Sequence, residues 1–523
     1  MLKNLAVVVK ASQVFVNFDG DRLSGDVPVR NALFETVSDV YIPLLNMFDS
    51  LERDNVPFRI ALVLPPVLCA VLDSSGFHKE FGEWLDRRIA LGGRELERCA
   101  GDSAASGSIS RTVADAVRTK SDFFDRYEKR LVRKFCEYQR KGFIEILATG
   151  GTGIFVPHYS GMDEILSAEI ETGIHAYRSS FGEFPDGFWL PEEGYVPGAE
   201  RIIRSYGFNY TILDSRAFLF SETPAAGGIF RPARTDNSLV VFADDFTLRD
   251  AVFGQNGYCK DDVYMDLNRD IGFELPVERL SPFLDGNEAR CPSGFCYWNR
   301  GRNPYDAGAA RERCAEDARL FLDGISGRLE RAGELLPGSD FVSLSFSLDA
   351  DMIRREWREG ICWLENVLRS ASDFSLNTAL FNEMLGRQFE LQKIRPYYSS
   401  SSGYGETFLS GRNSWMLRYT RKACERMTDL AERFPKDSGL KARLLNIGAK
   451  ELLIALSSDL ARMLDEDIFP EYARRRFEES IKAFTAVFDA LGSNTVSTEW
   501  LTRIETRDAV FPWMNYRIFS RKR

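Results

Sequence analysis

Two short segments of the chain carry carboxylates in positions where they could act on a glycosidic bond. The segment GFWLPEEGYVPGAE (187–200) ends an apolar run in Glu192 and Glu193, and the segment FVSLSFSLDA (341–350) ends another in Asp349. Retaining cleavage needs two such groups roughly 5 Å apart, one to attack the anomeric carbon and one to protonate the leaving oxygen. We therefore predict Glu192 and Asp349 as the reacting pair.

A structural role is the alternative for each of these acids. A carboxylate at a strand end can cap the following helix or pair with an arginine, here for example Arg354 or Arg355. Structural ion pairs outnumber catalytic ones, so the acids alone do not decide between the two interpretations.

The small number of histidines argues against metal-dependent chemistry. The chain has three, His78, His158 and His175. A His-ligated metal hydrolase, such as a barrel deacetylase, would have to draw its ligands from these three. We predict no metal and no other cofactor.

Seven apolar or β-branched runs that end in polar or turn residues predict a parallel barrel. They are LAVVV (5–9), RIALVLP (59–65), FIEILAT (143–149), GFWLP (187–191), FNYTILD (208–214), SLVVFADD (238–245) and FVSLSFSLDA (341–350). Strands buried on both faces read as continuous apolar segments, and helix-like stretches at 162–180 and 198–206 supply the alternation of β/α units. Active sites of such barrels lie at the carboxyl ends of the strands, where the acids cluster here. The sequence therefore predicts an α/β fold with a seven-stranded barrel.

Two further regions are predicted to be helical. Residues 79–140 are charged, with a break rich in Gly, Ser and Ala at 101–109, which is typical of a helical insert. From about residue 370 the strand pattern stops, and apolar residues recur at spacings of three and four. We predict a barrel domain over 1–370 and an all-helical C-terminal domain over 371–523.

Composition argues against several classes of partner. The 523 residues carry a formal net charge of −10 and give a pI near 5.3, so no basic field attracts nucleic acid or anionic lipid. No apolar run is long enough to span a membrane, and LAVVV is too short for a signal sequence. Nine scattered cysteines without CxxC spacing read as reduced thiols. We expect a cytoplasmic protein without a nucleic-acid or membrane partner, and the sequence predicts no oligomeric state.

Several motifs resemble those of glycoside hydrolase family 57, in particular its α-1,4-glucan branching enzymes. WLPEEGY (189–195) followed by PGAE (197–200) resembles the nucleophile motif, and Asp349-Ala350-Asp351 with Trp357 resembles the acid/base segment. Further matches follow in the family's order at 257–258, 269–274, 304–306, 400–405, 457–459 and 511–512. This collinearity is more specific than any single motif.

The resemblance implies a distorted (β/α)7 barrel with a helical insert and a C-terminal helical domain. It also implies retaining chemistry on α-glucans or malto-oligosaccharides without a metal. By position, Glu192 matches the nucleophile and Asp349 the general acid, then base. Glu193 falls where the branching enzymes usually have a cysteine. A second inward-facing carboxylate would raise the coupled pKa values, so we expect Glu193 to face elsewhere or to meet a cation.

The expected sugar contacts depart from the family pattern. The family's first strand ends in His-x-His, whereas this chain has Lys10, Ala11 and Ser12 there. Other family histidines match Gly153, Arg355 and Ser480, and family tryptophans match Glu356, Ser402 and Leu460. Each change removes an imidazole or an aromatic face that would hold a sugar ring.

The residues predicted to contact substrate lie in the matched motifs or at the altered positions. They are Lys10, Ser12, Trp189, Tyr195, Asp351, Arg355, Trp357, Ser402, Tyr404 and Asp459. The aromatic members could equally pack in the core. Lys10 could bind a hydroxyl or form an ion pair with a barrel acid, and a contact with Glu192 would lower the pKa of that carboxylate.

Two hypotheses follow. The first is an active α-glucan transglycosylase of the branching type, or a hydrolase, with altered sugar contacts; retention of Glu192 and Asp349 favours it. The second is a catalytically impaired relative that binds α-glucan, which the loss of imidazoles and tryptophans favours. Carboxylates about 5 to 6 Å apart in one cleft support the first. A wide separation, or Lys10 between the two carboxylates, supports the second.

Overall fold

Seven parallel strands close into a barrel, as the sequence predicts. In barrel order they are β1 (Leu2–Lys10), β4 (Ile60–Val63), β5 (Ile144–Thr149), β6 (Gly187–Trp189), β7 (Tyr210–Asp214), β9 (Val240–Asp244) and β10 (Phe341–Asp349). β10 runs beside β1 from Phe341 opposite Leu2 to Asp349 opposite Lys10, and a bridge between Ser345 and Asp244 closes the ring. The register therefore places Lys10 and Asp349 next to each other at the carboxyl end.

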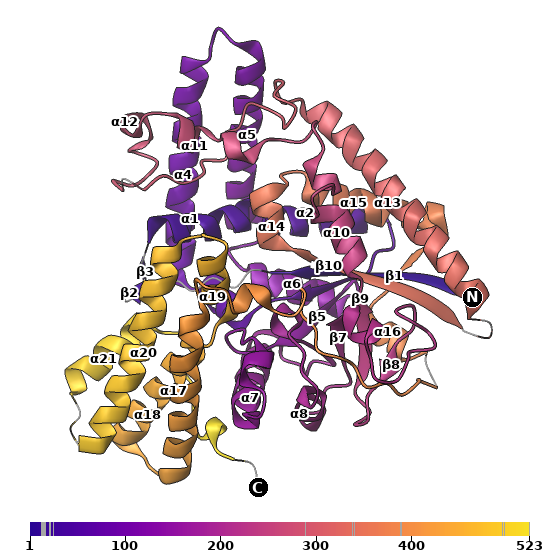
Figure 1. Ribbon diagram of the computed structural model, residues 1–523. Helices are drawn as coiled ribbons and strands as arrows, with labels where there is room; N and C mark the ends of the chain where they lie inside the picture. The colour runs from indigo at the N-terminus through magenta and orange to yellow at the C-terminus, as the bar shows by residue number, and fades with distance from the viewer. Residues whose placement is uncertain are drawn as a thin grey trace.

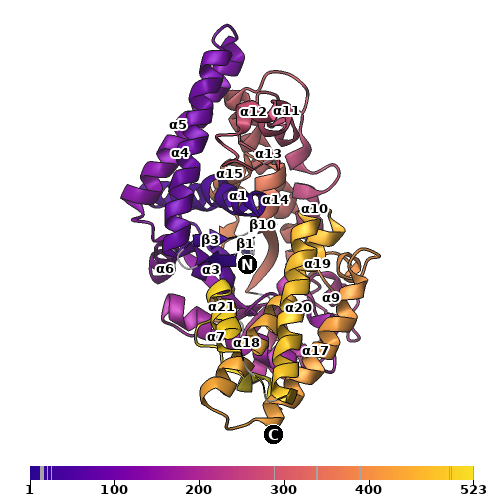
Figure 2. The same ribbon diagram turned by 90° about the vertical axis from the view of Figure 1, so that its left-hand side faces the viewer.

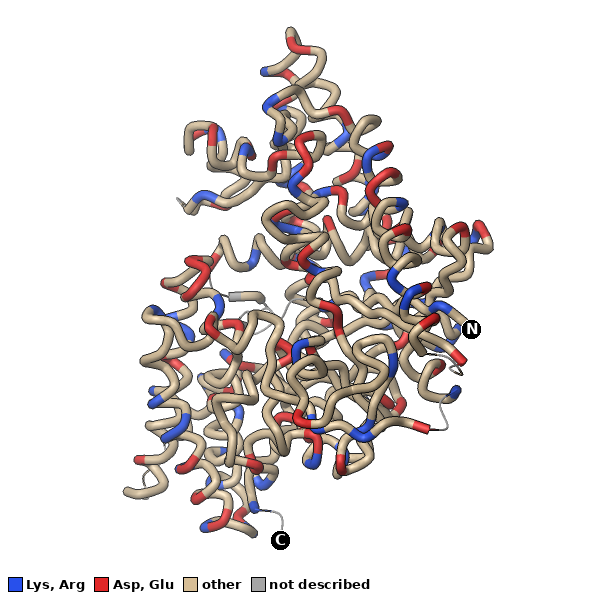
Figure 3. Tube along the Cα trace, turned by 45° about the vertical axis from the view of Figure 1, so that its right-hand side comes forward, with Lys and Arg blue, Asp and Glu red and all other residues tan. Residues whose placement is uncertain are grey.

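The computed structural model describes the chain except for residues 12–16, 20, 21, 25, 288, 337, 339, 388, 389, 494, 496, 522 and 523. Ser12, a predicted sugar contact, lies outside the described residues. In the described ranges, none of the helices combines the length and the apolar character that a bilayer span requires. The nine cysteines are all described, and each carries a free thiol. Acidic and basic residues are interspersed along the described chain (Figure 3).

Helices surround the barrel (Figure 1). They are α1 (Val27–Thr36), α2 (Ile42–Arg53), α3 (Pro66–Leu72), α7 (Asp163–Phe181), α8 (Ala199–Ser205), α9 (Arg216–Leu219), α10 (Phe246–Phe253), α13 (Ala307–Leu335), α14 (Ala350–Glu356) and α15 (Gly360–Ser370). The interior is filled by side chains that include Val8, Leu147, Trp189, Tyr210 and Phe242. The strands are buried on both faces, which explains their continuous apolar sequences.

The insert between β4 and β5 is helical, as its charged sequence predicts. α4 (Ser75–Arg98) and α5 (Ser103–Ser121) form a hairpin that projects from the barrel, and α6 (Leu131–Arg140) leads back to β5 (Figure 1). Side chains of Ser74 and Asp102 cap the amino ends of α4 and α5. A second excursion, between β9 and α13, carries the short helices α11 (Ile271–Glu274) and α12 (Val277–Leu280) beside this hairpin.

The C-terminal region is helical and covers one side of the barrel mouth (Figures 1 and 2). Its helices are α17 (Ser414–Arg433), α18 (Gly439–Ala455), α19 (Ser458–Asp465), α20 (Pro470–Ser493) and α21 (Thr498–Arg507). The amide of Ser458 donates to the carbonyl of Gly153 at 2.9 Å, which joins the start of α19 to the loop after β5. This contact brings the acids and bases of α19 to the carboxyl ends of the strands.

Strand structure does not stop at residue 370. β11 (Asn377–Thr378) pairs with β1, and α16 (Phe381–Leu385) places Phe381 against Tyr210 and Phe242 inside the barrel. Two residues are too few to produce a periodic pattern, so β11 could not be predicted from the sequence.

Candidate active site

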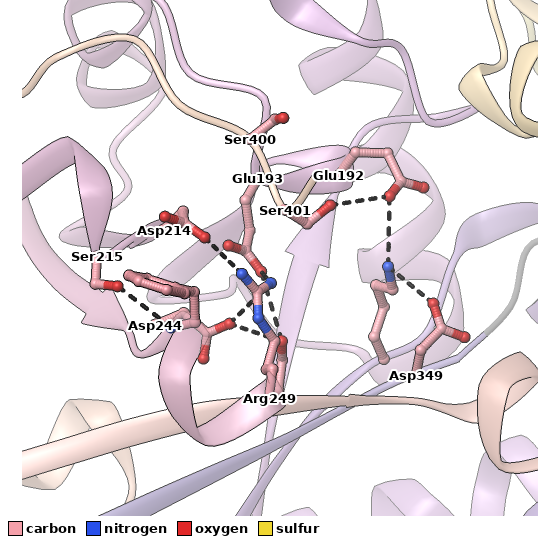
Figure 4. A network of polar contacts seen from close by, with 12 residues as sticks. Glu192, Glu193, Asp214, Ser215, Asp244, Arg249, Asp349, Ser400 and Ser401 are labelled. Atoms are coloured by element: carbon pink, nitrogen blue, oxygen red, sulfur yellow. Dashed lines mark hydrogen bonds and ion pairs between the residues drawn. The ribbon is translucent and has the colours of Figure 1, made fainter. Parts of the chain in front are cut away.

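Lys10, Glu192 and Asp349 meet at the carboxyl ends of β1, β6 and β10. The Lys10 Nζ lies 3.0 Å from Asp349 Oδ2 and 3.6 Å from Glu192 Oε2. One ammonium group therefore lies between the two carboxylates (Figure 4). The distance between Glu192 Oε2 and Asp349 Oδ2 cannot exceed the sum of these two distances. The fold thus brings the predicted pair together, and it also places Lys10 where the binding hypothesis expects it.

Glu192 lies on a strained turn that directly follows β6. Glu192 has φ 53° and Glu193 has φ 50°, so two consecutive non-glycine residues adopt the left-handed conformation. This conformation costs about 1 to 2 kcal/mol per residue, and such strain is often found at functional sites. The amide of Ser401 donates to the Glu192 carbonyl at 2.8 Å, and the Ser401 hydroxyl lies 3.3 Å from Glu192 Oε2. The loop around Ser401 thus holds the turn from the other side.

The two carboxylate oxygens of Asp349 make different contacts. The Oδ1 atom accepts hydrogen bonds from the amides of Asp351 at 2.8 Å and Met352 at 3.4 Å, and so caps α14. The Oδ2 atom faces Lys10, and Arg462 Nη1 lies 3.8 Å from it. The capping role that was the structural alternative is therefore present, and it leaves one oxygen for chemistry.

Both carboxylates have lowered pKa values. Burial alone would raise the pKa of Glu192 and of Asp349, but Lys10 and Arg462 together outweigh that effect in each case. A nucleophile has to be ionised, and Glu192 meets that condition. A general acid has to be protonated, and the cations around Asp349 oppose this as long as Lys10 stays in place.

Arg462 and Asp459 come to the site on α19. Arg462 Nη2 lies 2.7 Å from Asp459 Oδ1, and both residues line the cavity that holds Glu192 and Asp349. Burial raises the pKa of Asp459 to about 6 against the opposing effect of Arg462. Sequence reasoning found Asp459 but missed Arg462. The only signal was the spacing of three residues between an acid and a base on one helix.

Glu193 points away from Glu192 into a buried cluster of charges (Figure 4). Arg249, on α10, lies 2.7 Å from Glu193, 2.5 Å from Asp214 and 3.2 Å from Asp244. Burial raises the pKa of Glu193 well above its usual range, although Arg249 opposes this, and the neighbouring Asp244 and Asp214 add to it. The expectation that Glu193 meets a cation is confirmed. Asp214 and Asp244, two further strand-end acids, have structural roles here.

The cavity at the strand ends is small. It has a volume of about 40 Å³, and its walls include Pro65, Thr149, Gly153 and Pro191 in addition to the charged residues. This space accommodates a few water molecules and is too small for a glucosyl ring. Among the described residues, no group of three or more His, Cys, Asp or Glu side chains is arranged to hold a metal ion.

Two family models match this chain. The model described as glycosyl hydrolase family 57 matches residues 29–268, which contain Glu192. The model described as the C-terminal part of 1,4-alpha-glucan branching enzymes matches residues 419–519, which contain α19 with Asp459 and Arg462. Residues 29–268 are thus a glycoside hydrolase family 57 domain.

Individual relatives and solved structures resemble this chain over most of its length. The 1,4-alpha-glucan branching enzyme TK1436 of Thermococcus kodakarensis is 25% identical over 479 residues, which cover 85% of this chain and 68% of that protein. The structure matches that of the α-amylase AmyC from Thermotoga maritima with a TM-score of 0.91 and 26% identity over 100% of both chains. A GH57-type branching enzyme from Pyrococcus horikoshii matches with a TM-score of 0.87 over 99% of this chain and 97% of that chain; at 23% identity it shows the fold alone.

Three of the sugar contacts predicted from the family 57 resemblance line the cavity at the strand ends. They are Lys10, Trp189 and Asp459. Trp189 is buried, and its Nε1 has no partner among the described residues. Asp351 and Arg355 lie on α14 and pair with each other at 2.7 Å, and Arg355 also contacts Glu466 at 3.2 Å.

The remaining predicted contacts divide between core and surface. Tyr195 is buried and donates to Glu200 at 2.8 Å, and Trp357 packs against Tyr264 and Trp363. For Tyr195 the structure supports the core-packing alternative, whereas Trp357, although buried, also forms part of the wall of a cavity of about 680 Å³, as does Arg355. Tyr404 is 54% exposed, and Ser402 lies two residues before it in the loop that contacts Glu192.

Proposed function

We propose that this family 57 chain acts on α-1,4-glucans by a retaining mechanism and transfers the cleaved segment to another glucan chain. Glu192 is the nucleophile and Asp349 is the general acid, then base. The observation that carries the proposal is that Glu192 and Asp349, from β6 and β10, contact a single ammonium group in one cavity. The similarity to a branching enzyme over 85% of the chain supports transfer as the outcome.

The reaction has two steps, and each carboxylate has a different role in each step. In the first, Glu192 attacks the anomeric carbon, the bond to the leaving oxygen breaks, and Asp349 gives that oxygen its proton. In the second, Asp349 takes the proton of an acceptor hydroxyl, whose oxygen bonds to the anomeric carbon as the bond to Glu192 breaks. Glu192 leaves as a carboxylate, and Asp349 is again the protonated acid. Water in place of the acceptor gives hydrolysis, the outcome that similarity to an α-amylase would favour.

Lys10 has to withdraw for this chemistry to begin. Its ammonium group occupies the space between the two carboxylates, and it lowers the pKa of Asp349, which has to carry a proton in the first step. A donor chain that displaces Lys10 would open the cavity and weaken that effect at the same time. The position of Lys10 therefore makes activity depend on donor binding.

The same observation favours a second candidate function, glucan binding without chemistry. A lysine between the two carboxylates and a cavity of only about 40 Å³ are features that we would expect in a site that no longer catalyses the reaction. On this alternative, Glu192 and Asp349 serve to hold Lys10.

The test is incubation of amylose with the purified protein, beside Glu192→Gln, with iodine absorbance and new reducing ends measured together. Lower absorbance with few new reducing ends in the wild type alone would support chain transfer. Many new reducing ends would indicate hydrolysis. No change in either protein, with a melting temperature that amylose raises in both, would support glucan binding without chemistry.

A further inference from the structure

Two cysteine thiols meet where α13 packs against α15. The two helices lie side by side (Figures 1 and 2), and Phe321 contacts Trp363 between them, with ring centroids 5.1 Å apart. Cys314 lies on α13, two turns before Phe321, and Cys362 directly precedes Trp363 on α15. The two thiols are in hydrogen-bonding contact. The packing of the helices therefore brings together two sulfur atoms that are far apart in the sequence.

Backbone contacts also place Cys314 against the first turn of α15. The Cys314 Sγ donates to the carbonyl of Glu359 at 3.8 Å, and the same carbonyl accepts the amide of Trp363 at 2.9 Å. Asn366 Nδ2 donates to Cys362 Sγ at 3.9 Å from the next turn. Cys314 Sγ therefore lies beside the turn of α15 that contains Cys362.

Cys362 differs from the other eight cysteines in exposure and in pKa. All nine are described, and Cys362 is partly exposed whereas the others are buried. The hydrogen bond from Cys314 lowers the pKa of Cys362 against the effect of burial, and Arg311, one turn before Cys314, adds to the lowering. Burial raises the pKa of the seven thiols outside the pair, which are Cys69, Cys99, Cys136, Cys259, Cys291, Cys296 and Cys424. Because the thiolate is the reactive form, Cys362 is the most reactive thiol of the chain.

Cys314 has the complementary properties of a resolving cysteine. Its side chain is fully buried, and the contact with Cys362, together with burial, raises its pKa far above the usual range. Cys314 therefore stays protonated and donates to the Cys362 sulfur. An accessible thiolate next to a second cysteine is the arrangement that redox-sensing sites use.

We propose that Cys314 and Cys362 form a reversible redox site that hydrogen peroxide converts to a disulfide. The Cys362 thiolate attacks one peroxide oxygen, the O–O bond breaks, and the other oxygen leaves as hydroxide, which solvent protonates. The sulfur of Cys314 then attacks the Cys362 sulfenic acid, the S–O bond breaks, and the hydroxyl leaves with the Cys314 proton as a second water. Two electrons from the two thiols thus reduce one peroxide to two waters, and an external dithiol restores both cysteines.

The disulfide would form next to the segment that joins α15 to α14. Trp357, which follows α14, packs against Trp363 with ring centroids 5.4 Å apart, and Trp363 is the neighbour of Cys362. Asp349 caps the other end of α14. A covalent link at Cys362 would therefore restrain the helix that Asp349 begins. The redox site itself does not depend on the proposed function, because the thiols react whether or not the protein acts on glucans.

Peptide mass spectrometry of the full-length protein tests the proposal. The reduced protein is treated with a small excess of hydrogen peroxide, the remaining thiols are blocked at low pH, and the protein is digested without reductant. We expect one linked pair of peptides, joined through Cys314 and Cys362, that dithiothreitol separates. Before oxidation, iodoacetamide should alkylate Cys362 in the folded protein at least about tenfold faster than Cys99, which at 8% is the next most exposed thiol.

Serine variants separate the two roles. Cys314→Ser should leave Cys362 as a sulfenic acid that dimedone labels, whereas Cys362→Ser should leave Cys314 reduced after the same treatment. Cys99→Ser is the matched control, and it should form the link between Cys314 and Cys362 to the same extent as the wild type.

The results that would overturn the proposal come from the wild type and so do not depend on how the variants fold. They are survival of both thiols in a peroxide excess that oxidises free cysteine, a link through any other cysteine in place of this pair, and further oxidation of Cys362 to the sulfonic acid with Cys314 still reduced. Alkylation of Cys362 no faster than that of Cys99 would likewise contradict its role as the attacking thiol.

Discussion

Glu192 and Glu193 are adjacent and chemically identical, yet they lie in opposite environments. Glu192 faces the cavity, where Lys10 and Arg462 lower its pKa. Glu193 lies against Arg249, and burial raises its pKa, with a further contribution from the neighbouring carboxylates. Two consecutive left-handed residues make this divergence possible, because they turn the two side chains apart (Figure 4). The surroundings of a carboxylate, and not its residue type, therefore decide its chemical role.

Glu192→Gln should have the largest effect on activity. Loss of the nucleophile removes the covalent step, so any turnover of amylose should fall by about a thousandfold or more. Lys10 keeps its contact with Asp349, so the free energy of unfolding should change by about 1 kcal/mol or less. Iodine and reducing-end assays measure the first quantity, and urea titration measures the second. Undiminished turnover in this variant would reject Glu192 as nucleophile.

Arg249→Met should have the largest effect on stability. It leaves Glu193, Asp214 and Asp244 buried without their shared cation, and we expect a loss of about 3 to 5 kcal/mol in urea titration at pH 7. Without the cation, the folded-state pKa values of Glu193 and Asp244, which burial already raises, rise further above their unfolded values. The folded state then binds more protons, so the deficit should shrink as the pH falls toward 4.

The control for this variant is Arg443→Met, which removes an exposed pair with Glu505. Its cost should be at most about 1 kcal/mol at both pH values. If Arg249→Met and Arg443→Met lower the free energy of unfolding equally, the buried cluster around Arg249 does not stabilise the turn at Glu192 and Glu193.

Lys10→Met should shift the pH dependence of activity. The alkaline limb of kcat/KM reports the pKa of the general acid in the free enzyme, and Lys10 lowers the pKa of Asp349. Without Lys10 that pKa rises, more Asp349 is protonated at pH 7, and the alkaline limb moves to higher pH. Each pKa unit corresponds to about tenfold in activity on that limb. Lys3→Met, at the other end of β1, should leave the limb in place. If the alkaline limb of kcat/KM lies at the same pH in Lys10→Met as in the wild type, the proposed role of Asp349 as general acid is contradicted.

Glu193→Gln should have the smallest effect. The raised pKa of Glu193 favours its protonated form, which glutamine resembles in shape and hydrogen bonding. Stability and activity should both change by less than about 1 kcal/mol in free energy. If Glu193→Gln loses as much activity as Glu192→Gln, Glu193 also takes part in the reaction and the proposed difference between the two residues is wrong.

The barrel could be predicted from the sequence because its strands are buried on both faces. The runs that end at Lys10, Asp214 and Asp349 are rich in apolar or β-branched residues and each ends in a charged residue, and the closed ring places these charged residues at one end. β11 was missed because a two-residue strand carries no pattern.

The site could be predicted only in part. Resemblance to family motifs identified Glu192 and Asp349, but the contacts of Lys10 and Arg462 depend on the register of β1 beside β10 and on how α19 meets the barrel.

Trapping the covalent intermediate tests directly whether Glu192 is the nucleophile. Asp349→Asn, given α-maltotriosyl fluoride, should still be glycosylated, because fluoride leaves without a proton, and it should deglycosylate slowly for want of the base. Digestion and mass spectrometry should then find a maltotriosyl adduct on the peptide that contains Glu192, and no adduct when Glu192→Gln is added. An adduct on another residue, or release of fluoride with no adduct at all, would contradict the assignment of Glu192 as the nucleophile.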